Sequence, residues 1–250
     1  MTPNGNTILI TGATSGIGRE LAREFQNLGN KVIIAGRRKA VIDEATTANP
    51  GMSGYVLDID DPAAIKEFAA KILVDHPDLN VLVNNAGIMK AEELTAETID
   101  LAVAEATITT NLLGPIRLTA ALLPHLRKQP RSAIVNVSSG LAFVPLVITP
   151  TYNATKAAIH SYTISLRRQL QGTTVEVLEL IPPSVQTDLM PGHAEDPNAM
   201  PLADFMAETM AQFQLQPTPP EIKVERLKFL RDAEAEGRFE QTLDMLNSAH

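Results

Sequence analysis

Tyr152 and Lys156 stand four residues apart in the sequence, and Ser139 precedes them. If this segment is a helix, positions i and i+4 share one face, which places the phenol of Tyr152 beside the ammonium of Lys156. A neighbouring cation favours the phenolate, so we expect the pKa of Tyr152 to lie below its usual value of about 10. Such a tyrosine can exchange a proton with an alcohol or a carbonyl near neutral pH. Because a Tyr-x-x-x-Lys spacing also occurs on ordinary exposed helices, the assignment depends on the rest of the chain.

A glycine-containing loop near the start of the chain reads Thr-Gly-Ala-Thr-Ser-Gly-Ile-Gly over residues 11–18. It lies between an apolar run and an amphipathic stretch, where small residues let the backbone approach a pyrophosphate at a helix N-terminus. The spacing Gly-x-x-x-Gly-x-Gly differs from the Gly-x-Gly-x-x-Gly of many dehydrogenases. The alternative is a tight turn without a ligand. The predicted dinucleotide contacts are Gly12, Thr14, Ser15, Gly16, Ile17 and Gly18.

Two arginines, Arg37 and Arg38, follow the second predicted strand. A site that prefers NAD commonly has a carboxylate here for the ribose 2′-hydroxyl, and this turn contains none. A guanidinium suits the 2′-phosphate of NADP. We therefore predict NADP(H) as the preferred cofactor, bound mainly through Arg37. A solvated basic pair at the start of a helix is the alternative.

Short apolar runs alternate with amphipathic stretches along the chain, which is typical of βαβ units. Strands are predicted at residues 7–10, 31–35, 80–84, 133–137 and 175–180, and helices at 17–28, 61–73, 97–111, 114–128 and 152–171. The fold class is therefore α/β, a Rossmann-type doubly wound parallel sheet in a three-layer α/β/α arrangement. We expect a single domain over residues 1–250 that binds its ligand at the carboxyl ends of the strands.

Two C-terminal regions differ from this pattern. Residues 183–220 form a predicted substrate-loop region, rich in proline and containing Met200, Met206 and Met210. Its methionines suit a mobile cover over an apolar ligand, and an ordinary packed loop with a short helix is equally compatible. Beyond it, residues 221–229 can begin as an edge strand, and residues 226–246 are predicted to form a charged amphipathic helix with a solvated face.

The composition excludes several other classes of protein. A net charge of −8 argues against nucleic acid or an anionic membrane as the main partner. The absence of cysteine excludes disulfides and thiolate chemistry, and no two histidines have the helical spacing of metal ligands, so no metal site is expected. There is no apolar run long enough to span a membrane, and the polar start is not typical of a signal peptide. We therefore expect a cytoplasmic protein.

The motifs together resemble the short-chain dehydrogenase/reductase family over residues 7 to about 190. The glycine loop is followed in the family's order by Asn-Asn-Ala-Gly at 84–87, then by Asn111, Ser139 and the Tyr152–Lys156 pair. The gap of 13 residues from Ser139 to Tyr152 is the one common in the family, which favours Ser139 over Ser138. The resemblance implies a Rossmann-type sheet with the nicotinamide at the carboxyl ends of its strands.

The resemblance also implies roles for particular residues. Tyr152 would be the general acid in reduction and the base in oxidation. Lys156 would hold the nicotinamide ribose and lower the pKa of Tyr152, while Ser139 would donate a hydrogen bond to the substrate oxygen as charge develops. Asn111 would hold a water in a proton relay. By the same resemblance, further cofactor contacts are Asp58 and Ile59 at the adenine, Asn85, Ala86 and Gly87 at the adenosine ribose, and Pro182, Val185 and Thr187 at the nicotinamide amide.

The chain departs from the family in two places. After the strand at 175–180, which corresponds to the sixth strand of the family, Pro182-Pro183 replaces the frequent Pro-Gly. This alters the backbone beside the nicotinamide because proline fixes φ and donates no hydrogen bond. The glycine-rich C-terminal strand is missing, and the tail resembles instead a DltE-like subgroup of uncharacterised oxidoreductases. This tail makes a homodimer through the helices over 97–128 and 152–171 our expectation, with a tetramer as the alternative.

An apolar segment at residues 141–148 lies between Ser139 and Tyr152 and predicts a largely apolar substrate pocket, with core under the sheet edge as the alternative. The predicted activity is hydride transfer between NADP(H) and an uncharged carbonyl or secondary alcohol. A non-catalytic NADP(H) sensor or interaction protein is the alternative from another class. A serine hydrolase is disfavoured because no Gly-x-Ser-x-Gly elbow is present, and the glycine spacing argues against a sugar-nucleotide epimerase.

Overall fold

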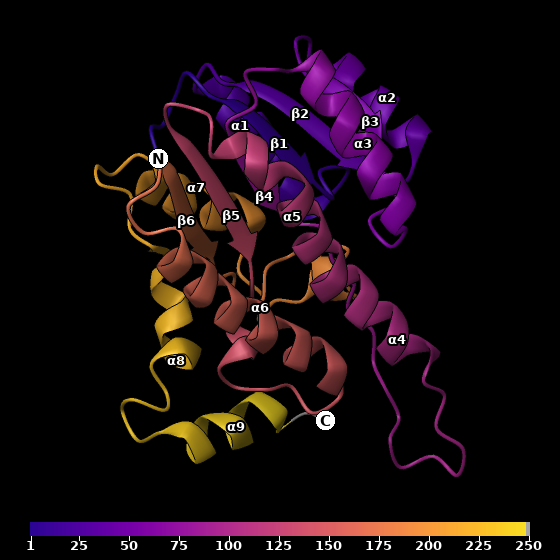
Figure 1. The fold of residues 1–250 in the computed structure, drawn as a ribbon. Helices are drawn as coiled ribbons and strands as arrows, with labels where there is room; N and C mark the ends of the chain where they lie inside the picture. Colours follow the sequence, from indigo (N-terminus) through magenta and orange to yellow (C-terminus); the bar gives the residue numbers. More distant parts are fainter. Residues whose placement is uncertain (249–250) are drawn as a thin grey trace.

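The computed structural model describes residues 1–248 and contains one continuous sheet of seven strands in the order β3-β2-β1-β4-β5-β6-β7. Every neighbouring pair is parallel. The strands are β1 (Thr7–Thr11), β2 (Lys31–Gly36), β3 (Ser53–Val56), β4 (Val81–Asn84), β5 (Ser132–Val137), β6 (Val175–Leu180) and β7 (Glu221–Ile222). The order reverses direction between β1 and β4, so the predicted doubly wound α/β fold is confirmed (Figure 1).

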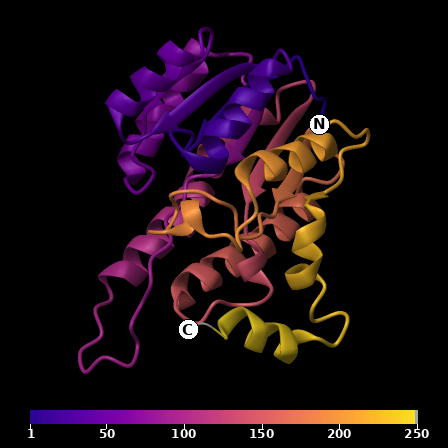
Figure 2. The same cartoon turned by 180° about the vertical axis from the view of Figure 1, so that it is seen from behind.

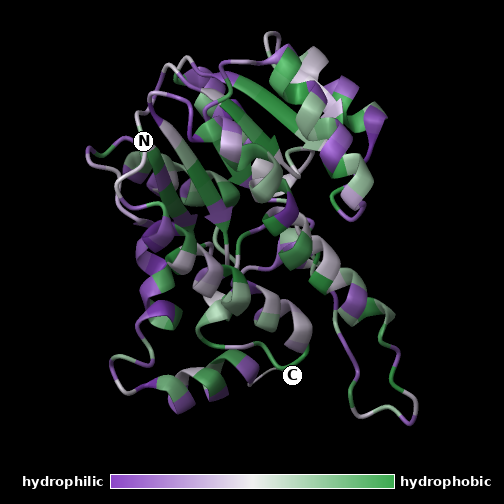
Figure 3. Cartoon of the chain, in the orientation of Figure 1, coloured by the Kyte–Doolittle hydropathy of each residue, from purple (hydrophilic) through white to green (hydrophobic). Residues whose placement is uncertain are grey.

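Helices cover both faces of the sheet (Figures 1 and 2). One face carries α1 (Gly16–Asn27), α2 (Lys39–Ala48) and α7 (Leu202–Phe213), and the other carries α3 (Pro62–Asp75), α5 (Gly114–Leu126) and α6 (Pro150–Gln169). Successive residues of a strand point to opposite faces. In β1, Ile8 and Ile10 accordingly pack under α1, whereas Leu9 packs on the other side. Burial on both faces explains why the central strands are almost continuously hydrophobic (Figure 3).

The helix predicted over 97–111 is shorter than expected. Helix α4 (Ala102–Ile108) begins five residues later and runs into one π-helical turn, Thr109–Leu113, before α5. The segment after β4 first packs against α6 through Met89 and Glu92, and residues 93–101 then form an exposed arm that projects from the body of the molecule beside α4 (Figure 1). Strand β3 and helix α2, absent from the sequence prediction, complete the half of the sheet next to β1.

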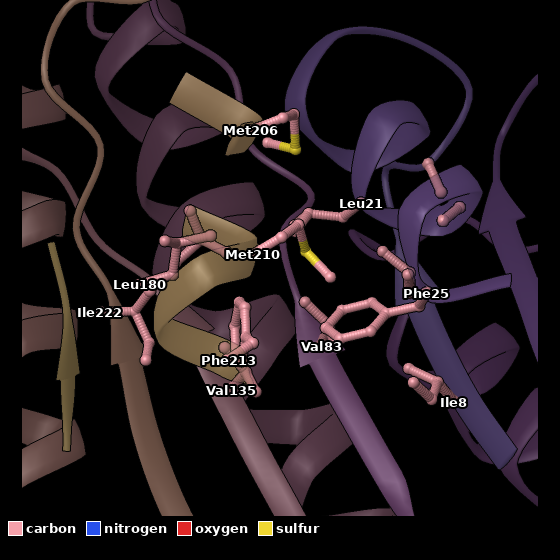
Figure 4. Packing of buried hydrophobic residues seen from close by; sticks show 14 of the residues in the cluster. Ile8, Leu21, Phe25, Val83, Val135, Leu180, Met206, Met210, Phe213 and Ile222 are labelled. Atoms are coloured by element: carbon pink, nitrogen blue, oxygen red, sulfur yellow. The ribbon is translucent and has the colours of Figure 1, made fainter. Parts of the chain in front are cut away.

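The methionines of the predicted substrate loop mostly belong to the core. Met206 and Met210 lie on α7 and are 4% and 6% exposed, and Phe213 of the same helix meets Phe25 of α1 edge-on at 5.2 Å (Figure 4). Met200 is buried in the same cluster. The packed-loop alternative is therefore correct for these residues, because α7 supplies the apolar cover that this side of β5 and β6 needs.

The tail is not the single helix predicted over 226–246. It contains a short 3₁₀ turn at Glu225–Leu227, then α8 (Lys228–Arg231) and α9 (Phe239–Asn247). Between the two helices, Gly237 takes a left-handed φ of 66°, which ends the helical path. The predicted edge strand is confirmed as β7, which is two residues long and pairs with β6.

Candidate active site

Tyr152 and Lys156 occupy the first turns of α6, whose N-terminal end lies below the carboxyl end of β5 (Figure 1). Both side chains are 5% exposed, and Nζ of Lys156 lies 5.5 Å from the centroid of the Tyr152 ring. Nζ also donates a hydrogen bond of 2.9 Å to the carbonyl oxygen of Val137, the last residue of β5. The i, i+4 spacing and the strand end together hold the phenol and the ammonium in one buried site.

Burial shifts the pKa values of these two groups in opposite directions. Desolvation raises the pKa of Tyr152 to about 12, and a smaller effect, a hydrogen bond with Ser139, opposes it. Desolvation lowers the pKa of Lys156 to about 8. The pKa of Tyr152 is therefore raised, whereas the sequence predicted that Lys156 would lower it. The reason is that burial removes water from the charged forms of both groups, which disfavours the phenolate of Tyr152 and the ammonium of Lys156.

Two adjacent serines at the end of β5 have different surroundings. Ser139 has an extended backbone, with φ of −166°, and its Oγ accepts a hydrogen bond of 3.1 Å from the Leu141 amide. The same hydroxyl is close enough to Tyr152 to act on the pKa of the phenol. Ser138 points elsewhere and donates a hydrogen bond of 2.6 Å to the fully buried Glu179. Because successive residues of extended chain face opposite ways, only Ser139 shares the site of Tyr152.

Asn111 lies in the π-helical turn, a type of distortion that often occurs at functional sites. Its Oδ1 accepts from the Ile88 amide at 2.8 Å, and its Nδ2 donates to the Ile88 carbonyl at 2.8 Å. A Cβ at Gly87 would lie 3.3 Å from Oδ1 of Asn111 and 3.8 Å from Nζ of Lys156. Gly87 therefore allows the β4 end, Asn111 and Lys156 to come close together.

The glycine loop packs tightly against the end of β4. A Cβ at Gly12 would approach the Ala86 backbone to 2.7 Å, and one at Gly18 would meet Nδ2 of Asn85 at 2.3 Å. That amide donates to the carbonyls of Thr11 and Gly12 at 3.0 and 3.2 Å. The glycines thus permit the close packing that fixes the loop, and Gly12 also takes a left-handed φ of 65°.

Helix α1 begins inside this loop, with Ser15 as its N-cap. The Ser15 side chain makes no capping hydrogen bond, and the first turn contains no acidic residue. The amides of this turn are therefore free of side-chain acceptors and suit an anion. A Cβ at Gly16 would lie 3.3 Å from Cγ2 of Thr187, so the residues after β6 approach the same turn.

Arg37 and Arg38 lie at the end of β2. The Arg37 side chain is 60% exposed and is 3.8 Å from Asp60, a long ion pair that leaves most of the guanidinium open. A Cβ at Gly36 would contact Thr14 at 3.1 Å, which places the glycine loop beside this strand end. Arg38 is the exposed N-cap residue of α2.

The remaining predicted cofactor residues lie along the same carboxyl edge. Asp58 is exposed after β3, and Ile59 is buried against Gly114 of the α5 start. Pro182 accepts a hydrogen bond of 2.8 Å from the amide of Gly140, and Val185 bridges to Met200. The predicted cofactor residues therefore lie along the edge of the sheet formed by the carboxyl ends of the strands, and they follow one another along it in the order of those strands.

A carboxylate that the sequence prediction missed lies beside Tyr152. Glu92, in the arm after β4, accepts hydrogen bonds from the amide of Thr151 at 2.9 Å and from its Oγ1 at 2.7 Å. The Glu92 amide in turn donates to the Ile148 carbonyl at 2.9 Å. Thr149, the N-cap residue of α6, makes no side-chain capping bond, so Glu92 supplies the acceptor from a distant part of the chain.

A second missed feature is a buried polar network behind Ser139. Glu179 of β6 accepts from Ser138 and also from Nδ1 of His160, at 3.0 and 2.9 Å to its two oxygens. His160 lies one turn beyond Lys156 on α6 and packs edge-on against Phe143 at 4.7 Å. The network therefore ties the β5 end to β6 and α6.

An apolar cluster surrounds Tyr152. Met89 and Leu146 are buried against it, and partly buried side chains complete the cluster: Leu141, Ile148, Met190 and Leu246. Three of these residues come from the predicted 141–148 segment. Within that segment, Val144 packs on the tail and Val147 is 54% exposed, so the segment lines the site only in part.

Among residues 1–248, no group of three histidine or acidic side chains is arranged to hold a metal ion. Within the same residues, no helix combines the length and the apolar character needed to cross a bilayer.

Comparison with known proteins identifies the class to which this fold and site belong. The sequence profile of the short chain dehydrogenases matches residues 6–198. The chain belongs to this family of oxidoreductases, which act on CH–OH and C=O groups with a nicotinamide cofactor.

Particular relatives agree with this assignment. The chain is 40% identical over 251 residues to the uncharacterized oxidoreductase DltE of Bacillus subtilis, covering 99% of both proteins. It is 35% identical over 177 residues to the NADP-dependent 3-hydroxy acid dehydrogenase YdfG of Shigella flexneri, covering 70% of this chain and 71% of that protein. The solved closed form of a serine dehydrogenase complexed with NADP+ has a TM-score of 0.78 at 28% identity, covering 87% of this chain and 94% of the other. The resemblance to the DltE-like subgroup, tail included, is confirmed.

Proposed function

We propose that this protein is an NADP(H)-dependent carbonyl reductase and alcohol dehydrogenase in which Tyr152 is the general acid and base. The observation that carries the proposal is the buried arrangement of Ser139, Tyr152 and Lys156 at the carboxyl end of β5. A hydroxyl donor, a titratable phenol and a cation are the groups that proton transfer to a carbonyl oxygen requires. We treat residues 1–250 as one cofactor-binding domain.

The residues at the strand ends fit a dinucleotide. The uncapped first turn of α1 and the glycine loop suit the pyrophosphate, and Arg37, exposed beside Thr14, suits a ribose 2′-phosphate. Lys156 would hold the nicotinamide ribose, and Pro182, Val185 and Thr187 would border its amide. The printed names of YdfG and of the NADP+-bound serine dehydrogenase support NADP as the cofactor class.

The nicotinamide supplies the hydride in reduction and accepts it in oxidation. In reduction, Tyr152 donates its proton to the carbonyl oxygen while the Ser139 hydroxyl donates a hydrogen bond to the same oxygen. The charge of Lys156 then stabilises the phenolate that is left. In oxidation, the phenolate takes the alcohol proton. A raised pKa of Tyr152 keeps the phenol protonated and ready to donate at neutral pH.

A proton path to Lys156 is supported by a small polar pocket. Its lining includes Asn84, Asn111, Asn136 and Lys156. Oδ1 of Asn84 is buried there and has no protein partner within the described chain. Since a buried carbonyl oxygen normally finds a donor, the orphaned Oδ1 supports a relay water at Asn111 that would reload Lys156. The pocket is too narrow for a water as it stands, so the side chains around Lys156 must shift to admit one.

The surroundings of Tyr152 favour an apolar substrate. Met89, Leu146 and Met190 contribute only carbon and sulfur side-chain atoms to the cluster. The cation beside Tyr152 is Lys156, which we assign to the nicotinamide ribose. Placing a substrate carboxylate against the apolar side chains would bury a charge without a partner, which is costly. The proposed substrates are therefore uncharged carbonyls and secondary alcohols.

Exposed apolar residues support a homodimer. Leu101, Ile108, Leu113 and Ile164 are 60%, 40%, 36% and 47% exposed on or beside α4, the π-helical turn and α6. Covering them with a second copy would remove apolar area from water. A cytoplasmic location remains part of the proposal.

Deuterium transfer tests the proposed activity against the sensor alternative. The protein is incubated with NADPH deuterated at C4 and a panel of aldehydes and ketones, and the products are examined by mass spectrometry. Deuterium on the former carbonyl carbon is the expected result. Tight NADPH binding with no labelled product from any compound would favour the non-catalytic sensor.

A further inference from the structure

The C-terminal tail packs directly on the segment that links Ser139 to Tyr152. A Cβ at Gly140, the residue after Ser139, would meet Cδ1 of Leu230 at 2.7 Å and Cδ1 of Leu227 at 3.0 Å. The Arg231 guanidinium lies over the Phe143 ring at 4.5 Å and bonds Glu221 at 2.8 Å. The tail therefore has a solvated face, as predicted, and a second face that packs on the segment between Ser139 and Tyr152.

Helix α9 holds the far end of the same segment. Oδ1 of Asn247 accepts from the Val147 amide at 2.8 Å, and Nδ2 donates to the Pro145 carbonyl at 3.1 Å. One side-chain amide thus satisfies two backbone groups of the loop. This pairing fixes the position of α9 beside the segment that leads into α6 (Figure 1).

This position brings Leu246 to the apolar cluster of Tyr152. Leu246 packs against the group formed by Met89, Leu146 and Tyr152, and also against the tail's own cluster around Val144. The preceding residue, Met245, faces away and is 57% exposed. Figure 3 shows the corresponding mixture of hydrophobic and hydrophilic residues along α9.

We infer that α9 forms one wall of the substrate pocket and that Leu246 is a specificity-determining residue that limits the size of an apolar group next to the reacting carbonyl. The inference rests on the proposed function for the reaction itself. It adds a substrate class, carbonyls with an alkyl or other uncharged apolar substituent, and it gives the tail a part in recognition.

The charges of the tail agree with this substrate class. The nearest basic side chains of the described tail are already engaged: Arg231 bonds Glu221 and covers Phe143, and Arg238 bonds Glu236 and lies over Phe229. No guanidinium of α8 or of the turn before α9 is left to bind a substrate carboxylate. The side chain that the described tail contributes to the cluster around Tyr152 is Leu246.

A chain-length series of aldehydes tests the inference. NADPH oxidation is measured with straight-chain aldehydes from propanal to decanal for the wild type, Leu246→Ala and Met245→Ala. Leu246→Ala should move the optimum of kcat/KM toward longer chains, with a change of about tenfold for the longest aldehydes, the effect of one or two methylenes in an apolar pocket. Met245→Ala should keep the wild-type profile, and all three proteins should bind NADPH equally. Identical profiles for the two variants would overturn the inference.

A binding measurement separates this inference from the proposed reaction. Binding of octan-1-ol to the NADPH complex, in which an alcohol cannot transfer a hydride, is measured by calorimetry for the wild type, Leu246→Asp and Met245→Asp. Weakening of at least about tenfold in Leu246→Asp alone supports the wall, whether or not the wild type turns over an aldehyde. Equal octanol affinity in the two variants would contradict the inference even for an active reductase. If Leu246→Asp does not fold, Leu246→Ser provides the milder change, judged by the same two outcomes.

Discussion

Glu92 caps α6, the helix that carries Tyr152, by bonding to Thr151, although Glu92 and Thr151 are 59 positions apart in the sequence. The carboxylate accepts from both the amide and the hydroxyl of Thr151, in the first turn of α6. A negative charge at a helix N-terminus is stabilised by the unpaired amides and the helix dipole. The arm after β4 and the residue next to the proposed general acid are therefore held together.

Glu92→Ala should lower both stability and turnover. Loss of the cap should cost about 1 kcal/mol of unfolding free energy and loosen the first turn of α6. We expect kcat to fall severalfold with little change in NADPH affinity, measured by steady-state kinetics and cofactor titration. Glu93→Ala is the matched control, since Glu93 is exposed and bonds only its neighbour Thr95. Equal behaviour of the two variants would show that the cap does not position Tyr152.

Arg37→Ala should weaken NADPH binding and leave NADH binding unchanged. The loss of a charge-assisted bond to the 2′-phosphate should cost about 2 kcal/mol, or roughly thirtyfold in Kd. Fluorescence titration of both cofactors measures this preference. Lys39→Ala is the control, because Lys39 is exposed nearby and pairs with Asp43 at 2.6 Å. A preference for NADPH that survives in Arg37→Ala would contradict the assignment.

The rate of carbonyl reduction should fall as pH rises above about 8. Burial lowers the pKa of Lys156 to about 8, so below that pH the ammonium is charged and stabilises the phenolate formed when Tyr152 gives up its proton. Above it, Lys156 is neutral, while the pKa of Tyr152 near 12 keeps the phenol protonated. The profile of kcat/KM from pH 6 to 10 should be flat and then descend, with one apparent pKa that belongs to the pair. A rate that rises through pH 8 would be incompatible with this account.

Glu179→Ala should be strongly destabilising. The change leaves the Ser138 hydroxyl and the His160 ring without their buried acceptor, at an expected cost of about 3 kcal/mol in unfolding free energy. Glu67→Ala on α3 is the control, because Glu67 is exposed and its replacement should cost less than about 1 kcal/mol. Urea denaturation of both variants measures the difference. A Glu179→Ala protein as stable as the control would show that the network is not needed to hold β5, β6 and α6 together.

The sheet could be predicted from the sequence because its strands are buried on both faces and separated by helical stretches. The grouping of Tyr152 with Lys156 also follows from local spacing, since residues i and i+4 of a helix share a face. Strand β3 was missed because its alternating exposure, with Gly54 and Val56 at exposed positions, lacks a continuous apolar run.

What could not be predicted depends on contacts between distant segments. The cap of α6 comes from Glu92, and no sequence pattern near Thr149 indicates this contact. The pKa of Tyr152 rises because burial desolvates the phenolate, and burial of this degree cannot be predicted from a four-residue spacing. Likewise, Met206 and Met210 belong to the core because α7 packs on α1, a pairing without a local signal.

The most direct test of the central claim is the rate of NADPH oxidation by Tyr152→Phe with a carbonyl that the wild type reduces. Tyr162→Phe is the matched control, since Tyr162 lies on the same helix and packs with the opposite core cluster. The account predicts a loss of at least about a hundredfold in kcat for Tyr152→Phe, with NADPH still bound, and a near wild-type rate for Tyr162→Phe. Turnover by Tyr152→Phe at the rate of the control would contradict the assignment of Tyr152 as the general acid.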